Sequence, residues 1–215
     1  MQIITIDGPA SSGKGTVAKI IATKLGLHYL ESGAVYRVVG LLAQRNNLHE
    51  GDVDKMLQLI DQTHIEFIGE AVMINGENVT HLIRHEGIGM LASRFSSVGV
   101  IRARLLRFQH DCAVEPGLVT DGRDMGSVVF PEANLKVYLT AVAEVRAQRR
   151  FTQLSHTGHA PVFNQILEGI ISRDERDSNR STAPLKFDQS FHLLDNSDMT
   201  IDETVDTIIS WLSKL

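Results

Sequence analysis

Residues 8–16 read GPASSGKGT and join an apolar stretch to a segment with helical periodicity. Glycines let a backbone curl so that its N–H groups converge on phosphate oxygens, and the start of the next helix adds positive potential. Lys14 supplies a mobile cation for the outer phosphates of a nucleotide, and Thr16 offers a hydroxyl to phosphate or Mg²⁺. The segment therefore predicts a phosphate-binding loop rather than a plain Gly/Ser turn, although Gly15 separates Lys14 from the hydroxyl residue that usually follows it directly. The expected nucleotide-binding residues are Gly8, Pro9, Ala10, Ser11, Ser12, Gly13, Lys14, Gly15 and Thr16.

Six arginines outside this loop are candidates for binding a second, phosphorylated molecule. A kinase that holds a nucleoside triphosphate must also hold an acceptor, and guanidinium groups suit both the acceptor phosphate and the group in transfer. A solvated surface charge is the alternative for each arginine taken alone. The candidates are Arg37, Arg102, Arg123, Arg173, Arg176 and Arg180.

Two aspartates, Asp7 and Asp121, end apolar runs that predict buried strands. In open α/β sheets ligands lie beyond the carboxyl ends of the strands, so either carboxylate could act on Mg²⁺ through water. Capping of the strand end is the alternative for both. Thr16 is the expected direct metal ligand.

The composition narrows the class of protein. The chain has 215 residues, 43% hydrophobic and 22% charged, which suits a globular protein of one to one and a half domains and excludes collagen-like, coiled-coil and wholly disordered chains. Its net charge of −5 argues against a nucleic-acid-binding protein. The single cysteine, Cys112, allows no internal disulfide, and no apolar run approaches the length of about 18 residues that a membrane span needs. With no signal peptide recognisable, we expect a cytoplasmic protein without membrane or nucleic-acid partners.

The elements that must position these residues follow from periodicity. Apolar runs predict strands at 2–6, 117–121, 135–140 and 192–194. Helical spacing predicts helices at 14–25, 33–46, 52–61, 86–95, 98–113, 143–154 and 163–179, and a C-terminal helix that Thr200 and Glu203 cap. Strands separated by helices predict an α/β fold, a parallel sheet with helices on both faces. Alternation across 63–80, with a turn at Asn75-Gly76, predicts a small antiparallel unit inserted between helices.

Four segments together carry a family resemblance. They are the loop at 8–16, ESGAVYR at 31–37, DGRDMGSVVFP at 121–131 and RDERDSNR at 173–180. In this order they resemble bacterial cytidylate kinases, of the nucleoside monophosphate kinase family of P-loop proteins, and the resemblance runs from Ile3 to the last helix. Glu31 stands where that family usually has Asp.

The resemblance implies a P-loop kinase fold with ATP and Mg²⁺ as cofactors. The γ-phosphate of ATP would pass to CMP or dCMP, giving CDP or dCDP. One kinase domain would span 1–215, with an inserted monophosphate-binding subdomain at about 63–85 and a lid at about 144–162 that carries Arg146, Arg149 and Arg150. We expect a monomer.

It also implies a role for each candidate side chain. The substrate-binding residues would be Ser32, Tyr36, Arg37, Ser93, Arg102, Arg123, Asp124, Arg173, Asp177 and Arg180, and the catalytic residues Lys14, Arg123, Arg176 and Arg180. Arg37 and Arg123 would bind the CMP phosphate, and Arg173 and Asp177 the sugar. Ser93, Arg102 and Asp124 would contact cytosine. A carboxylate such as that of Asp124 can accept a hydrogen bond from the exocyclic amine of this base.

Two other interpretations stay open. The first is a P-loop kinase of another small acceptor, such as UMP or shikimate. The second is a regulatory module that binds ATP without CMP-dependent turnover, which the presence of Lys14, Thr16 and all the candidate arginines disfavours.

Overall fold

The computed structural model describes residues 1–69, 71–156, 160–179, 185 and 187–213. The chain divides into two compact units. The first consists of Met1–Tyr29 and Val114–Leu215, and the second of Leu30–Ala113. Each unit is described by itself.

The first unit is built on a five-stranded sheet in the order β2-β6-β1-β7-β8. The strands are β1 (Gln2–Asp7), β2 (His28–Glu31), β6 (Gly117–Gly122), β7 (Leu135–Thr140) and β8 (His192–Asp195). The β1–β6, β1–β7 and β7–β8 ladders are parallel, and β1 lies at the centre between β6 and β7. The predicted α/β fold with a parallel sheet is confirmed. Strand β2 was not predicted, because its four residues include the exposed His28 and give no continuous apolar run.

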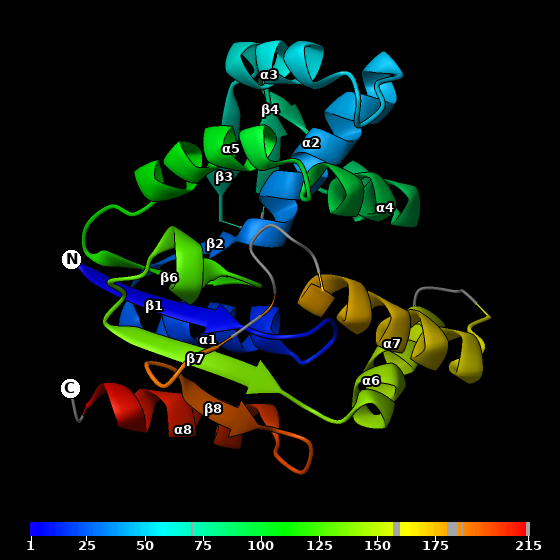
Figure 1. Cartoon of the computed structure of the whole chain (residues 1–215). Coiled ribbons are helices and arrows are strands. Elements are labelled where there is room, and N and C mark those ends of the chain that lie inside the picture. Colours follow the sequence, from blue (N-terminus) through cyan, green and yellow to red (C-terminus); the bar gives the residue numbers. More distant parts are fainter. Residues whose placement is uncertain (70, 157–159, 180–184, 186, 214–215) are drawn as a thin grey trace. The chain divides into compact units, whose positions relative to one another are not determined.

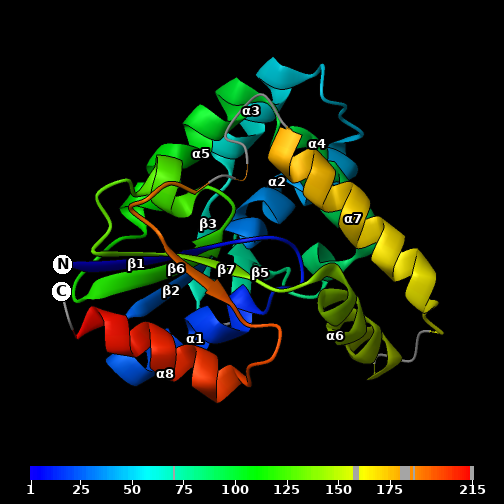
Figure 2. The same cartoon turned by 60° about the horizontal axis from the view of Figure 1, so that its bottom comes forward.

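Helices cover both faces of this sheet. The helices α1 (Lys14–Leu25) and α8 (Ile201–Leu212) lie together on one face (Figure 2), where Ile4 and Ile6 of β1 share their apolar core. The residues that alternate with these, Thr5 and Asp7, contact the short π-helix η2 (Met125–Val129) on the other face. Side chains of a strand alternate between its faces, so β1 holds a helix on each side.

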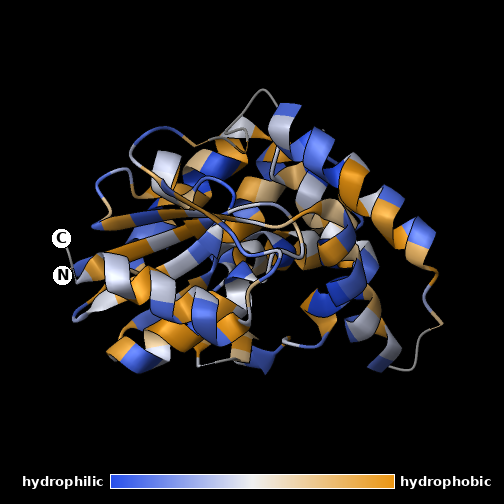
Figure 3. Ribbon diagram, turned by 90° about the horizontal axis from the view of Figure 1, so that it is seen from below, coloured by the Kyte–Doolittle hydropathy of each residue, from blue (hydrophilic) through white to orange (hydrophobic). Residues whose placement is uncertain are grey.

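Two further helices of this unit pack against each other. They are α6 (Ala143–His156) and α7 (Phe163–Asn179), which lie side by side in Figures 1 and 2. The hydrophobic residues of α7 lie in its first half, and its last turns are hydrophilic (Figure 3).

Among the described residues, the second unit combines four α-helices and one short 3-10 helix with a three-stranded sheet in the order β3-β4-β5. The strands β3 (Ile65–Ile68), β4 (Ala71–Ile74) and β5 (Glu77–Asn78) pair antiparallel, so the predicted small antiparallel unit is confirmed. The β4–β5 turn places Asn75 at φ 50° and Gly76 at φ 82°, the left-handed conformation that these two residue types tolerate best. The compact unit containing this sheet is wider than the predicted subdomain at 63–85.

Helix packing organises the remainder of the second unit. Its helices are α2 (Ser32–Asn46), α3 (Val53–Gln62), η1 (Leu82–Arg84), α4 (Glu86–Phe95) and α5 (Gly99–Asp111). Helix α2 crosses α4 at Gly40, where a Cβ would lie 2.7 Å from the carbonyl oxygen of Ile88. The absent side chain therefore sets how closely the two helices approach. No helix in the described part of the chain combines the length and apolar composition needed to cross a membrane.

Candidate active site

The predicted phosphate-binding loop connects β1 to α1. A Cβ on Gly8 would lie 2.0 Å from the carbonyl oxygen of Leu139, so only glycine fits where the loop leaves the sheet. Gly13 precedes the helix with φ 90°, and Ser11 also adopts a positive φ, of 60°. These conformations give the tight curl that turns successive backbone groups toward an anion. The loop and the helix after it thus have the predicted strand–loop–helix context.

Lys14 is held inside this loop. Its side chain is 8% exposed, and its ammonium donates a hydrogen bond to the carbonyl oxygen of Pro9 at 2.9 Å. Burial lowers the pKa of Lys14 below its usual value, and the positive charge of Arg123 lowers it further. Asp121 opposes this shift. An arriving polyanion would favour the charged form of this lysine, so the site is suited to a phosphate ligand.

The two strand-end aspartates have different partners. Both carboxylate oxygens of Asp7 accept backbone N–H groups, from Met125 at 2.9 Å and from Gly126 at 2.8 Å. Burial raises the pKa of Asp7 to about 7, while the two amide hydrogen bonds act in the opposite direction. Asp7 therefore caps backbone groups, as the alternative interpretation of its position stated.

Asp121 instead lies beside the first turn of α1. Its Oδ1 accepts a hydrogen bond from the Tyr29 hydroxyl at 2.7 Å, and a Cβ on Gly15 would lie 3.8 Å from both of its carboxylate oxygens. Thr16 follows Gly15 on the exposed side of that turn. A carboxylate and a hydroxyl are hard oxygen donors, so this corner fits Mg²⁺ and Asp7 does not.

The segment after β6 carries two of the predicted acceptor-binding residues. Arg123 donates from Nε to the carboxylate of Asp177 at 2.7 Å, and both side chains are largely buried. Asp124 is buried next to Arg123, and its carbonyl oxygen accepts the N–H groups of Val128 and Val129. The structure thus brings Arg123, Asp124 and Asp177 together in one unit.

The remaining candidates on α7 have exposed side chains. Arg173 is exposed, and its charge contributes to the lowered pKa of Lys14. Arg176 is also exposed and donates to the carbonyl oxygen of Ser172, one turn back on the same helix. Arg180, predicted as catalytic and substrate-binding, lies outside the described residues.

Helix α6, part of the predicted lid, is attached to the phosphate loop through two arginines. Buried Arg146 donates to the carbonyl oxygens of Ala141 and Ala10 and pairs with Asp174 at 2.6 Å. Arg149 donates to the carbonyl oxygen of Ser12 at 3.1 Å. These contacts fix the near end of α6 on the loop, so Arg146 and Arg149 are not simply solvated charges. Residues 157–159 of the predicted lid lie outside the described residues.

In the second unit, Tyr36 and Arg102 are in contact. The Arg102 guanidinium lies over the Tyr36 ring, 5.5 Å from its centroid, and donates to the carbonyl oxygen of Ser96. The Ser96 hydroxyl in turn donates to the carbonyl oxygen of Ser93. The corner between α4 and α5 therefore holds Ser93 and Arg102 near the first turns of α2, where Ser32 is buried.

Arg37 belongs to the same helix as Tyr36 and faces η1. Its Nη1 donates to the carbonyl oxygen of Ile83 at 2.7 Å and to that of His85 at 3.3 Å. A Cβ on Gly89 would lie 2.9 Å from Arg37 Nη2, so a glycine there leaves room for the guanidinium. The predicted substrate-binding side chains of this unit thus come from α2, α4 and α5.

The chain is similar to known proteins over nearly its whole length. The family described as "Cytidylate kinase" matches residues 4–214. A cytidylate kinase of Chromobacterium violaceum is 45% identical over 214 residues, covering 100% of this chain and 96% of that protein. One from Nitrosomonas europaea is 42% identical, with 98% and 94% covered. The chain belongs to the cytidylate kinase family.

A solved structure supports the fold without bearing on activity. An uncharacterized protein from Eubacterium ventriosum matches with a TM-score of 0.57 at 11% identity, covering 100% of this chain and 99% of that one. The resemblance recognised in the sequence is confirmed for the family and for the P-loop kinase fold class.

Glu31, just before the first residue of α2, forms an ion pair. The Arg84 guanidinium donates two hydrogen bonds of 2.7 Å to the two carboxylate oxygens of Glu31. This fork holds the residue directly before Ser32 at the start of α2. The ion pair therefore fixes the side chain of Glu31 at the start of α2.

Sequence reasoning missed two polar residues that support the candidate site. Asn196 is buried, donates from Nδ2 to the carbonyl oxygen of Ser12 and accepts from Arg149. Tyr29 holds Asp121. Asn196 directly follows β8, which ends at Asp195, one residue beyond the strand predicted at 192–194, and it could have been found by the strand-end rule applied to Asp121. No sequence signal singles out Tyr29.

Proposed function

We propose that the protein transfers the γ-phosphate of ATP to CMP or dCMP, giving ADP and CDP or dCDP. Membership of the cytidylate kinase family makes it an ATP-dependent phosphotransferase acting on small nucleotides. The observation that carries the assignment is that one unit holds both the buried Lys14, in the loop after β1, and the Arg123–Asp177 ion pair, whose arginine directly follows the neighbouring strand β6. One cation belongs to the loop that would bind the donor, and the other to the segment that would bind the acceptor.

The donor would be bound by the loop at residues 8–16. Its backbone N–H groups and Lys14 would contact the phosphates of ATP. Thr16 would hold Mg²⁺ directly and Asp121 through water. The ion, when bound, neutralises charge on the outer phosphates.

The acceptor would be bound by residues of both units. Arg37 and Arg123 would receive its phosphate, and Arg173 and Asp177 its sugar. Asp124, Ser93 and Arg102 would contact the base, with Ser32 and Tyr36 beside it. Arg176 and Arg180 would act on the phosphate in transfer. The acceptor is a phosphate monoester, already anionic near neutral pH, so alignment and charge neutralisation replace a strong general base.

The base contacts explain a preference for cytosine. The carboxylate of Asp124 would accept a hydrogen bond from the exocyclic amine of cytosine, whereas uracil has a carbonyl oxygen at the same position of the ring. A site built to hydrogen-bond a group rejects analogues that leave its buried polar atoms unpaired. The burial of Asp124 supports this role. We further propose that the enzyme acts in the cytoplasm as a monomer.

A coupled assay of ADP release tests the proposal. The enzyme is given Mg-ATP with CMP, dCMP, UMP, AMP or GMP in turn. Fast release with CMP and dCMP alone supports it. Equal or faster release with UMP favours the kinase of another acceptor, and ATP binding without stimulation by any monophosphate favours the regulatory module.

Asp124→Asn tests the base contact. The amide both accepts and donates, so it can pair with the carbonyl of uracil as well as with the amine of cytosine. We expect the ratio of kcat/KM for CMP to that for UMP to fall by about tenfold, the equivalent of one hydrogen bond to a charged group. An unchanged ratio would remove Asp124 from base recognition.

A further inference from the structure

Asp7 has a distinctive position at the end of the central strand. Its side chain is 0% exposed, and each carboxylate oxygen accepts one backbone N–H group. The two donors, Met125 and Gly126, are consecutive residues at the start of η2. A carboxylate is the side chain of this length that offers two acceptors and no donor. Asp7 is therefore matched to this pair of amides.

These amides directly follow two residues of the acceptor site. On the near side of Arg123 and Asp124, the backbone of Asp7 is in register with Gly122 in the β1–β6 ladder. On the far side, the carboxylate of Asp7 holds Met125 and Gly126. One residue thus fixes the chain on both sides of the Arg123–Asp124 pair, and the pair has little freedom to shift along the strand.

The turn is also pressed against β1. A Cβ on Gly126 would lie 2.6 Å from Oγ1 of Thr5 and 2.9 Å from Cζ of Phe191. Thr5 and Asp7 lie two residues apart on the same face of β1, so steric contact and hydrogen bonding act at adjacent points. Because of this close approach, the turn at Gly126 cannot move any nearer to β1.

We propose that Asp7 is a positioning residue for the acceptor nucleotide, acting through the segment that carries Arg123 and Asp124. The inference rests on the proposed roles of those two residues. It assigns to Asp7 neither a contact with substrate nor a role in holding Mg²⁺. When the hydrogen bonds from Met125 and Gly126 to Asp7 are lost, Arg123 and Asp124 can move. The first consequence is weaker and less selective binding of the acceptor.

Asp7→Asn is the decisive variant. Asparagine has nearly the same size, but its NH₂ group faces one of the two N–H donors and leaves that donor unpaired. We expect KM for CMP to rise by about tenfold or more, as for one lost charge-assisted hydrogen bond, and the preference for CMP over UMP to fall. We expect KM for ATP to change by less than about twofold, because the hydrogen bond of Lys14 to Pro9 does not involve Asp7.

Thr5→Val is the matched control. Thr5 is fully buried on the same strand face and contacts the same turn, and its hydroxyl has no hydrogen-bond partner among the described residues. Valine keeps the shape of threonine, so both KM values and the CMP preference are expected to stay at wild-type levels.

Gly126→Ala is the second variant, used if Asp7→Asn does not fold. It displaces the same turn while Asp7 is intact, so it should raise KM for CMP and leave KM for ATP nearly unchanged.

The outcomes separate the inference from the proposed function. A wild-type enzyme without CMP-dependent turnover would overturn the proposed function itself. Activity with CMP in the wild type, together with equal rises of both KM values or an unchanged CMP preference in the Asp7 variant, would overturn the positioning role alone. A rise confined to the acceptor, with a reduced CMP preference, supports it.

Discussion

Lys14 is buried in the loop after β1, where its ammonium donates a hydrogen bond to the carbonyl oxygen of Pro9. The motif at residues 8–16 predicted a cation for phosphate at this position. The loop could be predicted because its chemistry depends on consecutive residues. The contacts of Asn196 and Tyr29 could not, because they join residues 184 and 92 positions apart in the chain.

The loop lysine gives the first prediction at this scale. Lys14→Ala should lower kcat by at least about a hundredfold, since the removed cation would stabilise charge on the phosphates in transfer. The variant should still unfold in a single cooperative thermal transition, as expected of an intact fold. Lys24→Ala is the control, because Lys24 lies on the same helix and pairs with Asp206 at the surface. Steady-state kinetics that showed near wild-type kcat for Lys14→Ala would remove it from the ATP site.

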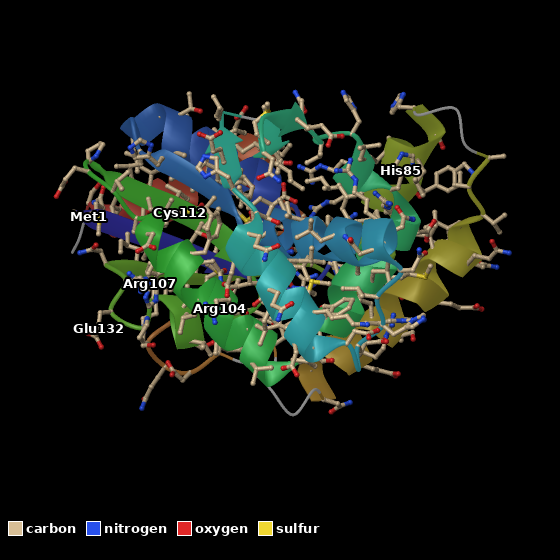
Figure 4. The ribbon with its side chains drawn as sticks, turned by 90° about the horizontal axis from the view of Figure 1, so that it is seen from above. Met1, His85, Arg104, Arg107, Cys112 and Glu132 are labelled. Atoms are coloured by element: carbon tan, nitrogen blue, oxygen red, sulfur yellow. The ribbon has the colours of Figure 1, made fainter. Side chains whose placement is uncertain are left out.

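The raised pKa of Cys112 gives a prediction of thiol reactivity. Cys112 follows the last residue of α5 (Figure 4), and burial, with a smaller contribution from Asp111, raises the pKa of its thiol to about 11. Because the thiolate is the reactive form, the raised pKa keeps the folded protein slow to alkylate at pH 8. Unfolding restores the usual pKa, so the iodoacetamide rate should rise by about a hundredfold, the effect of two pKa units. Equal rates in buffer and in denaturant would contradict this environment.

At the scale of elements, long periodic segments were predicted well and short ones were not. The helix predicted at 14–25 and the capping box of Thr200 and Glu203 are both confirmed. Strand β2 and the π-helix η2 were missed. Helix η2 depends on the side chain of Asp7, 118 residues away from Met125. Its five residues carry no periodicity of their own.

The crossing of α2 and α4 gives the prediction at this scale. Gly40→Ala places a methyl group against backbone atoms of α4 and should destabilise the protein by about 1–3 kcal/mol, the usual effect of overpacking. Gly87→Ala, on α4 with no atom within 4 Å of the added Cβ, should be neutral or stabilise the fold by up to about 1 kcal/mol. Urea denaturation of both variants is the measurement. Equal free energies of unfolding for the two would contradict the close approach at Gly40.

At the scale of the whole molecule, the residues proposed to bind the acceptor are distributed over the two compact units. Ser32, Tyr36, Arg37, Ser93 and Arg102 belong to the second unit, while Arg123, Asp124 and Asp177 belong to the first. The motifs allowed these residues to be listed from the sequence. The sequence does not show that these residues belong to two units, because the units are defined by contacts between segments that are far apart in the chain.

This division predicts ligand-dependent protection. Bound substrates should reduce local opening of the predicted lid at 144–162 and of the antiparallel unit at 63–80. Amide hydrogen exchange with CMP and a non-hydrolysable ATP analogue should be slower in both segments than without ligand. Helix α8, remote from the proposed contacts, is the internal reference. Unchanged exchange in both segments would contradict closure.

The central claim is that phosphate passes from ATP to CMP rather than to water. Incubation of the enzyme with Mg²⁺, CMP and ATP labelled in its γ-phosphate, followed by separation of CDP from inorganic phosphate, tests it most directly. The account predicts that nearly all transferred label appears in CDP and that Lys14→Ala abolishes the transfer. Label appearing in inorganic phosphate alone, with none in CDP, would contradict it.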